Sequence, residues 1–157
     1  MKKNIPLIFL AFAILFGSCK KEEPDTTGPP SGGGTPASTE SPDFVTFNNG
    51  AIPSGWKTYT WEVDKKFGHN DNFALKSANS VAIVYTTKTM KQEGFVEFYS
   101  YGDKISFYID DVAMPKQSTK GSWTKSVYPL EPGLHTFKWQ AEGIDRYIDD
   151  IKFYSAN

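Results

Sequence analysis

Side chains able to do covalent chemistry are few in this 157-residue sequence. Cys19 is the only cysteine, so no disulfide can form within the chain. The two histidines, His69 and His135, lie in neither a Gly-x-Ser-x-Gly nor a His-Glu-x-x-His motif, which are patterns of serine hydrolases and zinc proteases. We expect His135 to be a satisfied core residue, and we expect the chain not to be an enzyme.

Paired carboxylates are the remaining route to catalysis, because two acidic residues can hydrolyse a glycosidic bond. The nearest pattern is Glu62-Val63-Asp64, and it lacks the second glutamate of the Glu-x-Asp-x-x-Glu pattern known from jelly-roll glycosidases. A glycan-active enzyme is therefore the least favoured alternative.

Asp149 is the carboxylate whose position is most unusual. In an expected strand at 146–154, it alternates with Tyr147, Ile151 and Phe153 on a face that we expect to point into the core. A buried carboxylate is costly unless it is paired or binds a cation. Asp149 is thus the candidate ligand for a structural calcium ion, with Asn48 as a second candidate. The alternative is that Asp149 accepts hydrogen bonds from a neighbouring strand or loop.

A hairpin is expected where the runs 94–100 and 104–110 flank Gly102-Asp103, a sequence that favours a two-residue turn. Tyr101 would then lie opposite Lys104, and the two runs would pair directly. The expected core face of this hairpin pairs Ser100 with Ile105, Phe98 with Phe107 and Val96 with Ile109.

The opposite face of that hairpin carries aromatic side chains, which suit stacking on a sugar or contact with a protein. The alternative is that a loop, or the connection 113–122, covers them. The four tryptophans fit core positions better than a ligand platform. The candidate ligand-binding residues are Phe95, Tyr99, Tyr101 and Tyr108.

Short alternating runs rich in Phe, Tyr, Trp, Val and Ile, bounded by Gly, Pro, Asn or Asp, follow residue 43, and no window has a sustained helical period. They predict an all-β fold, an antiparallel two-sheet jelly-roll β-sandwich of about nine strands. The expected strands are 44–47, 57–63, 73–77, 81–87, 94–100, 104–110, 123–128, 134–140 and 146–154.

The first 18 residues have the layout of a signal peptide, with a basic start, an apolar run too short to span a bilayer, and small residues before Cys19. Leu15-Phe16-Gly17-Ser18-Cys19 resembles the bacterial lipobox, with Phe16 where Leu is more usual. This resemblance implies cleavage before Cys19 and lipidation of its sulfur and amine, which would anchor the chain stably in a membrane.

Between the lipobox and the strands the sequence is a tether. Sixteen of the nineteen residues from Pro24 to Pro42 are Pro, Gly, Ser or Thr, a composition that cannot form a core. We therefore expect three segments: a signal peptide at 1–18, a lipidated, disordered tether at 19–43, and a folded domain at 44–157.

Lys20-Lys21-Glu22-Glu23 follows the cysteine and resembles the surface-export signal of Bacteroidetes lipoproteins; the alternative is a solvated charge run. The resemblance implies an outer-membrane lipoprotein facing the cell exterior. Residues 44–157 hold 13 Lys and Arg and 13 Asp and Glu, so the domain lacks the basic surface that nucleic-acid binding needs.

The order of motifs along 44–153 is similar to that of a jelly-roll domain of secreted bacterial proteins, the cleaved-adhesin domain of gingipains and, more loosely, MAM and other concanavalin-like domains. That resemblance implies an accessory or adhesion module, often with a structural calcium. Two departures weaken the transfer: Asn48 replaces an acidic residue, and two loops are short. The motifs are Phe47-Asn48-Asn49-Gly50, Ile52-Pro53-Ser54-Gly55-Trp56, Ala74-Leu75-Lys76-Ser77, Phe107-Tyr108-Ile109-Asp110, Gly133-Leu134-His135-Thr136-Phe137-Lys138-Trp139 and Ile148-Asp149-Asp150-Ile151.

These observations together predict a surface-exposed lipoprotein that carries a non-catalytic binding or adhesion module for a glycan or a protein. The competing function is a structural accessory lipoprotein of an envelope assembly without a small ligand. A solvent-exposed and concave outer face on the 94–110 hairpin would favour binding, whereas a covered face would favour assembly.

Overall fold

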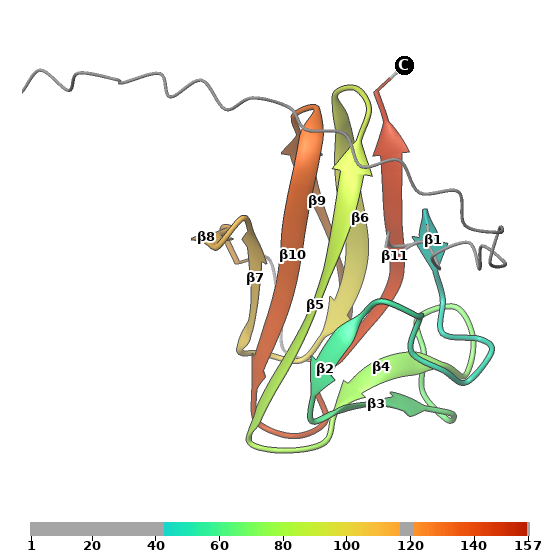
Figure 1. Ribbon diagram of the computed structural model, residues 1–157. Coiled ribbons are helices and arrows are strands. Elements are labelled where there is room, and N and C mark those ends of the chain that lie inside the picture. The colour runs from blue at the N-terminus through green and yellow to red at the C-terminus, as the bar shows by residue number, and fades with distance from the viewer. Residues whose placement is uncertain (1–42, 117–120, 157) are drawn as a thin grey trace, which may run out of the picture. The chain divides into compact units, whose positions relative to one another are not determined.

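A computed structural model of the chain describes residues 43–116 and 121–156 (Figure 1). These residues form strands and turns only, and among them no helix is long and apolar enough to cross a membrane. Cys19, the expected signal peptide and all but the last residue of the expected tether lie outside the described residues.

The described chain is an antiparallel two-sheet β-sandwich, as the sequence predicts. In Figure 1, β5 and β10 of one sheet cross in front of strands of the other. Sheet A has the order β3-β4-β11-β6-β9, with β1 paired to β11, and sheet B has the order β2-β5-β10-β7-β8. The strands are β1 (Phe44–Val45), β2 (Lys57–Tyr59), β3 (Trp61–Asp64), β4 (Ala74–Ser77), β5 (Val81–Met90), β6 (Gly94–Tyr101), β7 (Ile105–Ile109), β8 (Val112–Ala113), β9 (Trp123–Leu130), β10 (Gly133–Glu142) and β11 (Tyr147–Ser155).

Each of the nine predicted strands is present, and eleven strands are found because of two local features. The predicted strand 57–63 is divided at Thr60, whose φ of 55° turns the chain from sheet B into sheet A. The short strand β8 pairs with the end of β7, through Val112 opposite Ile109 and Ala113 opposite Tyr108.

The predicted hairpin between β6 and β7 is wrong. β6 lies between β11 and β9 in sheet A, whereas β7 lies between β10 and β8 in sheet B, so Gly102-Asp103 connects the two sheets. Phe98 and Phe107 do meet, with ring centroids 4.8 Å apart, but they meet across the core and not as cross-strand neighbours. The predicted core residues of both strands are buried: Val96, Phe98, Ser100, Ile105, Phe107 and Ile109.

Aromatic rings fill the space between the sheets. Trp139 of β10 is fully buried and stacks on Trp56, with centroids 5.7 Å apart and planes 7° apart. Phe98 approaches Trp139 edge-on from sheet A, and Phe107 packs beside it from sheet B. This core fixes the inward residues of every long strand, and therefore also which residues point outward.

A β-bulge in β11 corrects the predicted core face of that strand. The register with β6 shifts between Asp149 and Lys152, and Asp150 has a φ of 48°. As a result Ile151 and Phe153 point into the core, whereas Tyr147 and Asp149 point to the outer face of sheet A. The four residues do not share one face, because the bulge adds one residue to the alternation.

Candidate functional site

Three of the four aromatic candidates share one face. Phe95, Tyr99 and Tyr101 alternate with core residues of β6, and they are half-buried on the outer face of sheet A. Tyr108 of β7 lies on the outer face of sheet B, on the far side of the sandwich. The four residues therefore do not form one platform, because their strands belong to different sheets.

Tyr101 lies in a cluster of aromatic rings, which we call the sheet A cluster and define as Phe67, Tyr101, Trp123 and Tyr147. Trp123 is the cross-strand partner of Tyr101 on β9, and Tyr147 is its partner on β11. Phe67 comes from the β3–β4 loop (residues 65–73) and stacks on Trp123, with centroids 5.6 Å apart and planes 18° apart. The ring centroid of Phe67 also lies 5.0 Å from that of Tyr101 and 4.8 Å from that of Tyr147.

Asp64 directs Phe67 onto the sheet. Its Oδ1 accepts hydrogen bonds from the backbone N–H groups of Lys66 at 2.7 Å and Phe67 at 3.2 Å, an Asx-type turn at the end of β3. Gly68 follows, and a β-carbon there would overlap the backbone of Phe73. The β3–β4 loop thus folds back on itself and places its ring over the outer face.

His69 is a second residue of the β3–β4 loop that contacts the outer face of sheet A, next to the sheet A cluster. Its ring stacks on Tyr99, with centroids 3.5 Å apart, and its Nδ1 lies 2.8 Å from Oδ2 of Asp150. Asn70 donates a side-chain hydrogen bond to the same oxygen. The predicted covering by a loop therefore occurs over Tyr99, although the loop is 65–73 and not the connection 113–122.

Asp149 accepts hydrogen bonds, as the alternative to a metal ligand required. Its Oδ2 accepts the backbone N–H of His69 at 2.9 Å, and its Oδ1 accepts that of Asp150 at 2.8 Å. Asp149 is only 1% exposed. Burial raises the pKa of this carboxyl to about 7, although the two hydrogen bonds favour its ionised form.

The described residues contain no group of three or more His, Cys, Asp and Glu side chains placed to hold a metal ion. Calcium takes six to eight oxygen ligands, and the side chain of Asp149 already accepts two N–H groups. This donor set does not by itself form a calcium cage. A structural calcium ion stays a prediction.

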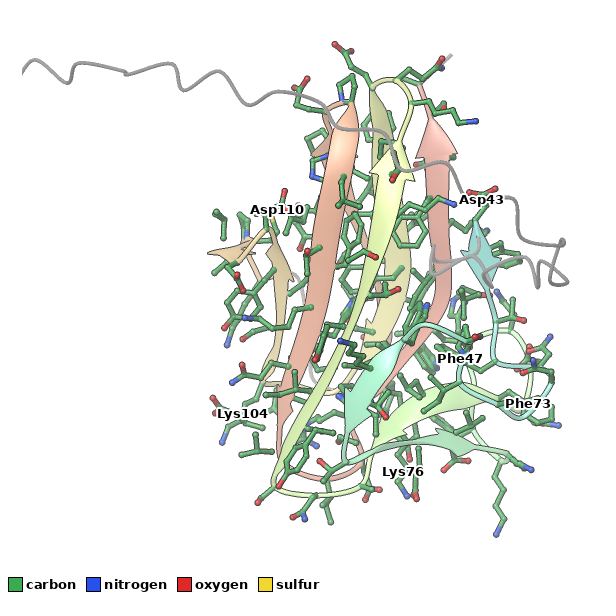
Figure 2. The ribbon with its side chains drawn as sticks, in the orientation of Figure 1. Asp43, Phe47, Phe73, Lys76, Lys104 and Asp110 are labelled. Atoms are coloured by element: carbon green, nitrogen blue, oxygen red, sulfur yellow. The ribbon has the colours of Figure 1, made fainter. Side chains whose placement is uncertain are left out.

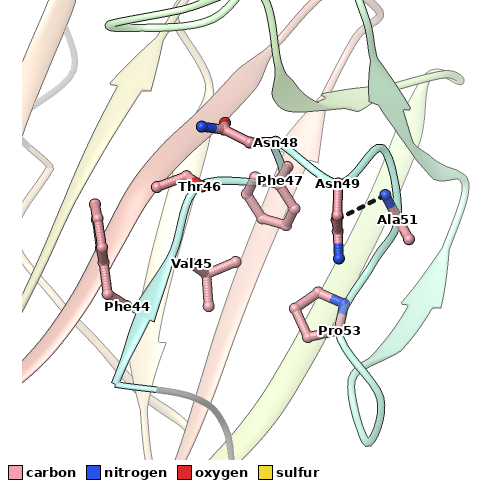
Figure 3. Close-up of a pocket in the computed structure, with 8 residues that line it drawn as sticks. All are labelled: Phe44, Val45, Thr46, Phe47, Asn48, Asn49, Ala51 and Pro53. Carbon is pink, nitrogen blue, oxygen red and sulfur yellow. Dashed lines mark hydrogen bonds between the residues drawn. The ribbon is translucent and has the colours of Figure 1, made fainter.

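Asn48, the second metal candidate, is exposed in the loop after β1. It lines an open hollow of about 420 Å³, shown in Figure 3, in which the side chain of Asn49 accepts the backbone N–H of Ala51 at 3.0 Å. The other lining residues are Phe44, Val45, Thr46, Phe47, Ala51 and Pro53.

An ion pair between the buried Glu97 and the exposed Lys125 extends the outer face along β6. Glu97 points outward between Phe95 and Tyr99, yet it is only 7% exposed. Nζ of Lys125 on β9 lies 2.9 Å from its Oε2, and this hydrogen bond raises the pKa of the lysine above its usual value. The outer face of sheet A thus combines aromatic rings with a charged donor and acceptor.

Phe67, His69, Trp123 and Tyr147 were not among the candidates. Trp123 was expected in the core, where the other three tryptophans, Trp56, Trp61 and Trp139, are indeed buried. Its outward position follows from β9, in which Ser126, Tyr128 and Leu130 are the buried alternates. That alternation was a usable signal for Trp123, whereas no local pattern places Phe67 and His69 on this face.

His135 has partners for both ring nitrogens, as expected, but it is not the core residue that the sequence predicts. It is half-buried, and its Nδ1 and Nε2 lie 2.7 Å from Asp110 Oδ2 and 2.8 Å from the Glu131 carbonyl. Asp110 also accepts the backbone N–H of Thr136 at 2.7 Å, so it is not a freely solvated strand end. Figure 2 shows Asp110 at the opposite end of β7 from Lys104.

No protein-family model matches the sequence, and no curated protein matches it. Among solved structures, the chain is similar to TmCBM61, a carbohydrate-binding module in complex with β-1,4-galactotriose. The identity is 16%, the TM-score is 0.56, and the match covers 71% of this chain and 94% of the module.

A native family 35 carbohydrate-binding module from Clostridium thermocellum has a TM-score of 0.48 at 14% identity, over 65% of this chain and 93% of that one. A CBM35 from Paenibacillus barcinonensis has a TM-score of 0.48 at 12% identity, over 65% and 94%. At such identities the likeness to the family 61 module shows a shared fold: this chain has the β-sandwich of a carbohydrate-binding module.

Proposed function

We propose that the chain is a non-catalytic carbohydrate-binding module that contacts its glycan with the outer face of sheet A. The sheet A cluster is the observation that carries the proposal, because four aromatic rings gather at one end of a sheet beside Tyr99. Phe67 is exposed, Tyr101 and Trp123 are half-buried, and Tyr147 is buried. The fold shared with the family 61 module, which was solved with β-1,4-galactotriose, supports the same ligand class.

Sugar recognition needs apolar stacking together with polar groups that meet hydroxyls. The half-buried rings of Tyr101 and Trp123 supply the apolar surface, and the carboxylate of Glu97 and the ammonium of Lys125 supply the polar groups. Since Glu97 and Lys125 neutralise each other, an uncharged oligosaccharide is the ligand class that this face suits.

A glycan array probed with the full chain tests the proposal. We expect binding to a defined set of oligosaccharides, and we expect Tyr101→Ala to weaken it about tenfold, the loss for one aromatic contact of about 1.4 kcal/mol. Phe44→Ala is the matched control, since Phe44 is an exposed ring at the edge of the same sheet. Absence of binding to every glycan, or equal weakening by both variants, would contradict the proposal.

A structural role in an envelope assembly remains a second candidate, and one observation favours it. The β3–β4 loop covers Tyr99 through the His69 stack, so part of the outer face is withdrawn from a ligand. The two functions differ in a pull-down of the full chain from solubilised envelopes. A stoichiometric protein partner whose capture survives Tyr101→Ala and excess oligosaccharide would favour assembly.

The proposed location is the outer membrane, with lipid on Cys19 and the module facing the cell exterior. The Leu15–Cys19 motif and the charges at 20–23 support this location. Labelling of cells with a radioactive fatty acid should mark the wild type and leave Cys19→Ala unmarked. Protease treatment of intact cells should then remove the module if it faces outward.

A further inference from the structure

The outer face of sheet B is the second surface of the sandwich, and it carries exposed apolar side chains that the fold leaves unused. Strands β5, β10 and β7 lie side by side in this sheet (Figure 1). Patches of exposed apolar residues on one face are typical of interaction sites. The exposed residues on this face are Tyr59, Val81, Tyr85 and Leu134.

Two tyrosines form a row with a lysine between them. Lys138 on β10 is the direct cross-strand partner of Tyr85 on β5 and of Tyr108 on β7. Neighbouring strands lie about 4.8 Å apart, so the two tyrosines are about 10 Å apart across the sheet. The row runs across the strands, and all three side chains point away from the core because Phe137 and Trp139 point into it.

The row borders an open hollow of about 270 Å³ lined by Tyr85, Asp111, Thr136 and Lys138. Nζ of Lys138 lies 4.2 Å from the ring centroid of Tyr108 and 3.1 Å from Oδ1 of Asp111. The hollow thus presents a hydroxyl, an ammonium and a carboxylate beside the ring of Tyr85, and the same ammonium lies over the neighbouring ring of Tyr108.

Charge on this face is balanced. Lys57 and Lys138 point outward together with Asp111 and Glu142, so the face offers no net field to attract a polyanion. Two rings separated by about two strand spacings, with hydrogen-bonding groups between them, match alternate sugar rings of a short chain.

We propose that the outer face of sheet B is a second saccharide-binding surface, in which Tyr85 and Tyr108 stack on an uncharged oligosaccharide and Lys138, Thr136 and Asp111 bind its hydroxyls. This goes beyond the proposed function and rests on it for the ligand class, because it gives one module two binding faces. Two faces on opposite sides of the sandwich allow one molecule to bridge two glycan chains and raise the avidity for a polysaccharide.

The test is a backbone-amide NMR titration of the full chain with four probes used separately: β-1,4-galactotriose, cellotetraose, xylotetraose and mannotetraose. We expect at least one probe to shift the amides of β5, β7 and β10 saturably. Tyr85→Ala and Tyr108→Ala, made singly, should each weaken that response about tenfold, and Phe44→Ala should leave it unchanged.

Sheet A is followed in the same spectra, so the two proposals are judged separately. Shifts at Tyr101 and Trp123 without shifts on sheet B would overturn the second surface and keep the proposed function. Shifts on sheet B without shifts at Tyr101 and Trp123 would support the second surface and overturn the proposed binding at sheet A. Shifts on sheet B that follow protein concentration instead of sugar would assign the face to a second copy of the chain and overturn the proposal, as would no response to any probe.

Discussion

Tyr101 and Asp149 lie on the same outer face of sheet A but have different roles there. Tyr101 shares its ring contacts with Phe67, Trp123 and Tyr147 and stays partly exposed. Asp149 is covered by the β3–β4 loop, and its oxygens accept two backbone N–H groups. The first residue is therefore available to a ligand, whereas the second holds the loop that shapes the surface.

Asp149 should make stability depend on pH. Its pKa is about 7 in the folded chain and 3.8 ordinarily, so the folded state binds the proton more tightly. Protonation of Asp149 therefore contributes up to about 4 kcal/mol to the free energy of unfolding. The contribution is fully present below about pH 3.8 and is lost as the pH rises through 7. Urea unfolding of the wild type and Asp149→Asn from pH 4 to pH 8 measures it as the difference between the two proteins.

A pH-independent difference between wild type and Asp149→Asn would contradict this account of Asp149. A bound calcium ion would reverse the trend, because it stabilises the ionised carboxylate. Unfolding of the wild type at pH 8 with and without a chelator therefore tests the calcium prediction separately, and a loss of stability with chelator would support it.

His135 and Asp110 stabilise the end of β7 through their mutual hydrogen bond. Burial lowers the pKa of His135, but the hydrogen bonds to Asp110 and the Glu131 carbonyl outweigh it and raise the pKa above 6.5. For Asp110, burial is outweighed by hydrogen bonds from Thr136 and His135, which lower its pKa below 3.8. The pair is thus fully stabilising between about pH 3.8 and pH 6.5.

His135→Gln should therefore lower the free energy of unfolding most at about pH 5, and its effect should shrink as the pH rises through the folded pKa of His135. Thermal unfolding at pH 5 and pH 9 measures the change. An effect that is equal at both pH values would mean that the histidine acts only through packing.

At the scale of elements, the β3–β4 loop decides how much of the outer face of sheet A is open. It holds its position through Asp64, Gly68 and the bonds of His69 to Asp149 and Asp150. The residues Phe67 and His69 come from sequence far from β6, which is why no local pattern in the sequence indicates their contact with Tyr99 and Tyr101.

Gly68→Ala should loosen this loop, because a β-carbon at that position would overlap the backbone of Phe73. We expect faster amide hydrogen exchange in residues 65–73, with the exchange of β6 and β10 unchanged, and a loss of stability of about 1–3 kcal/mol. Lys66→Ala is the control, since Lys66 is exposed in the same loop and already has a β-carbon. Unchanged exchange in the loop of Gly68→Ala would contradict the role of this glycine.

The strands themselves could be predicted because their alternation is strong, but their pairing could not. A hairpin between β6 and β7 buries the same residues as the observed crossover, so the alternation in Val96-Phe98-Ser100 fits both arrangements. The bulge at Asp150 could not be predicted either, because the residues of β11 are the same whether the strand is regular or bulged. The outward orientation of each aromatic candidate could consequently be predicted, whereas the division of the candidates between two sheets could not.

At the scale of the molecule, one core supports both outer faces. Trp139, Phe107 and Phe98 touch across the two sheets, so the faces are held by the same aromatic packing. Phe107→Ala should lower the free energy of unfolding by about 3–5 kcal/mol. Far-ultraviolet circular dichroism and tryptophan fluorescence should report one coincident transition, and two separated transitions would show that the sheets unfold independently.

The central claim is that a glycan binds at the sheet A cluster, and Trp123 offers a direct probe of it. Trp56, Trp61 and Trp139 are buried in the core, whereas Trp123 is half-buried on the outer face. We predict that titrating the full chain with the oligosaccharide selected on the array changes its tryptophan fluorescence saturably, and that Trp123→Phe abolishes the change while keeping most of the affinity. A bound oligosaccharide that leaves the fluorescence unchanged, or a change that persists in Trp123→Phe, would contradict the claim.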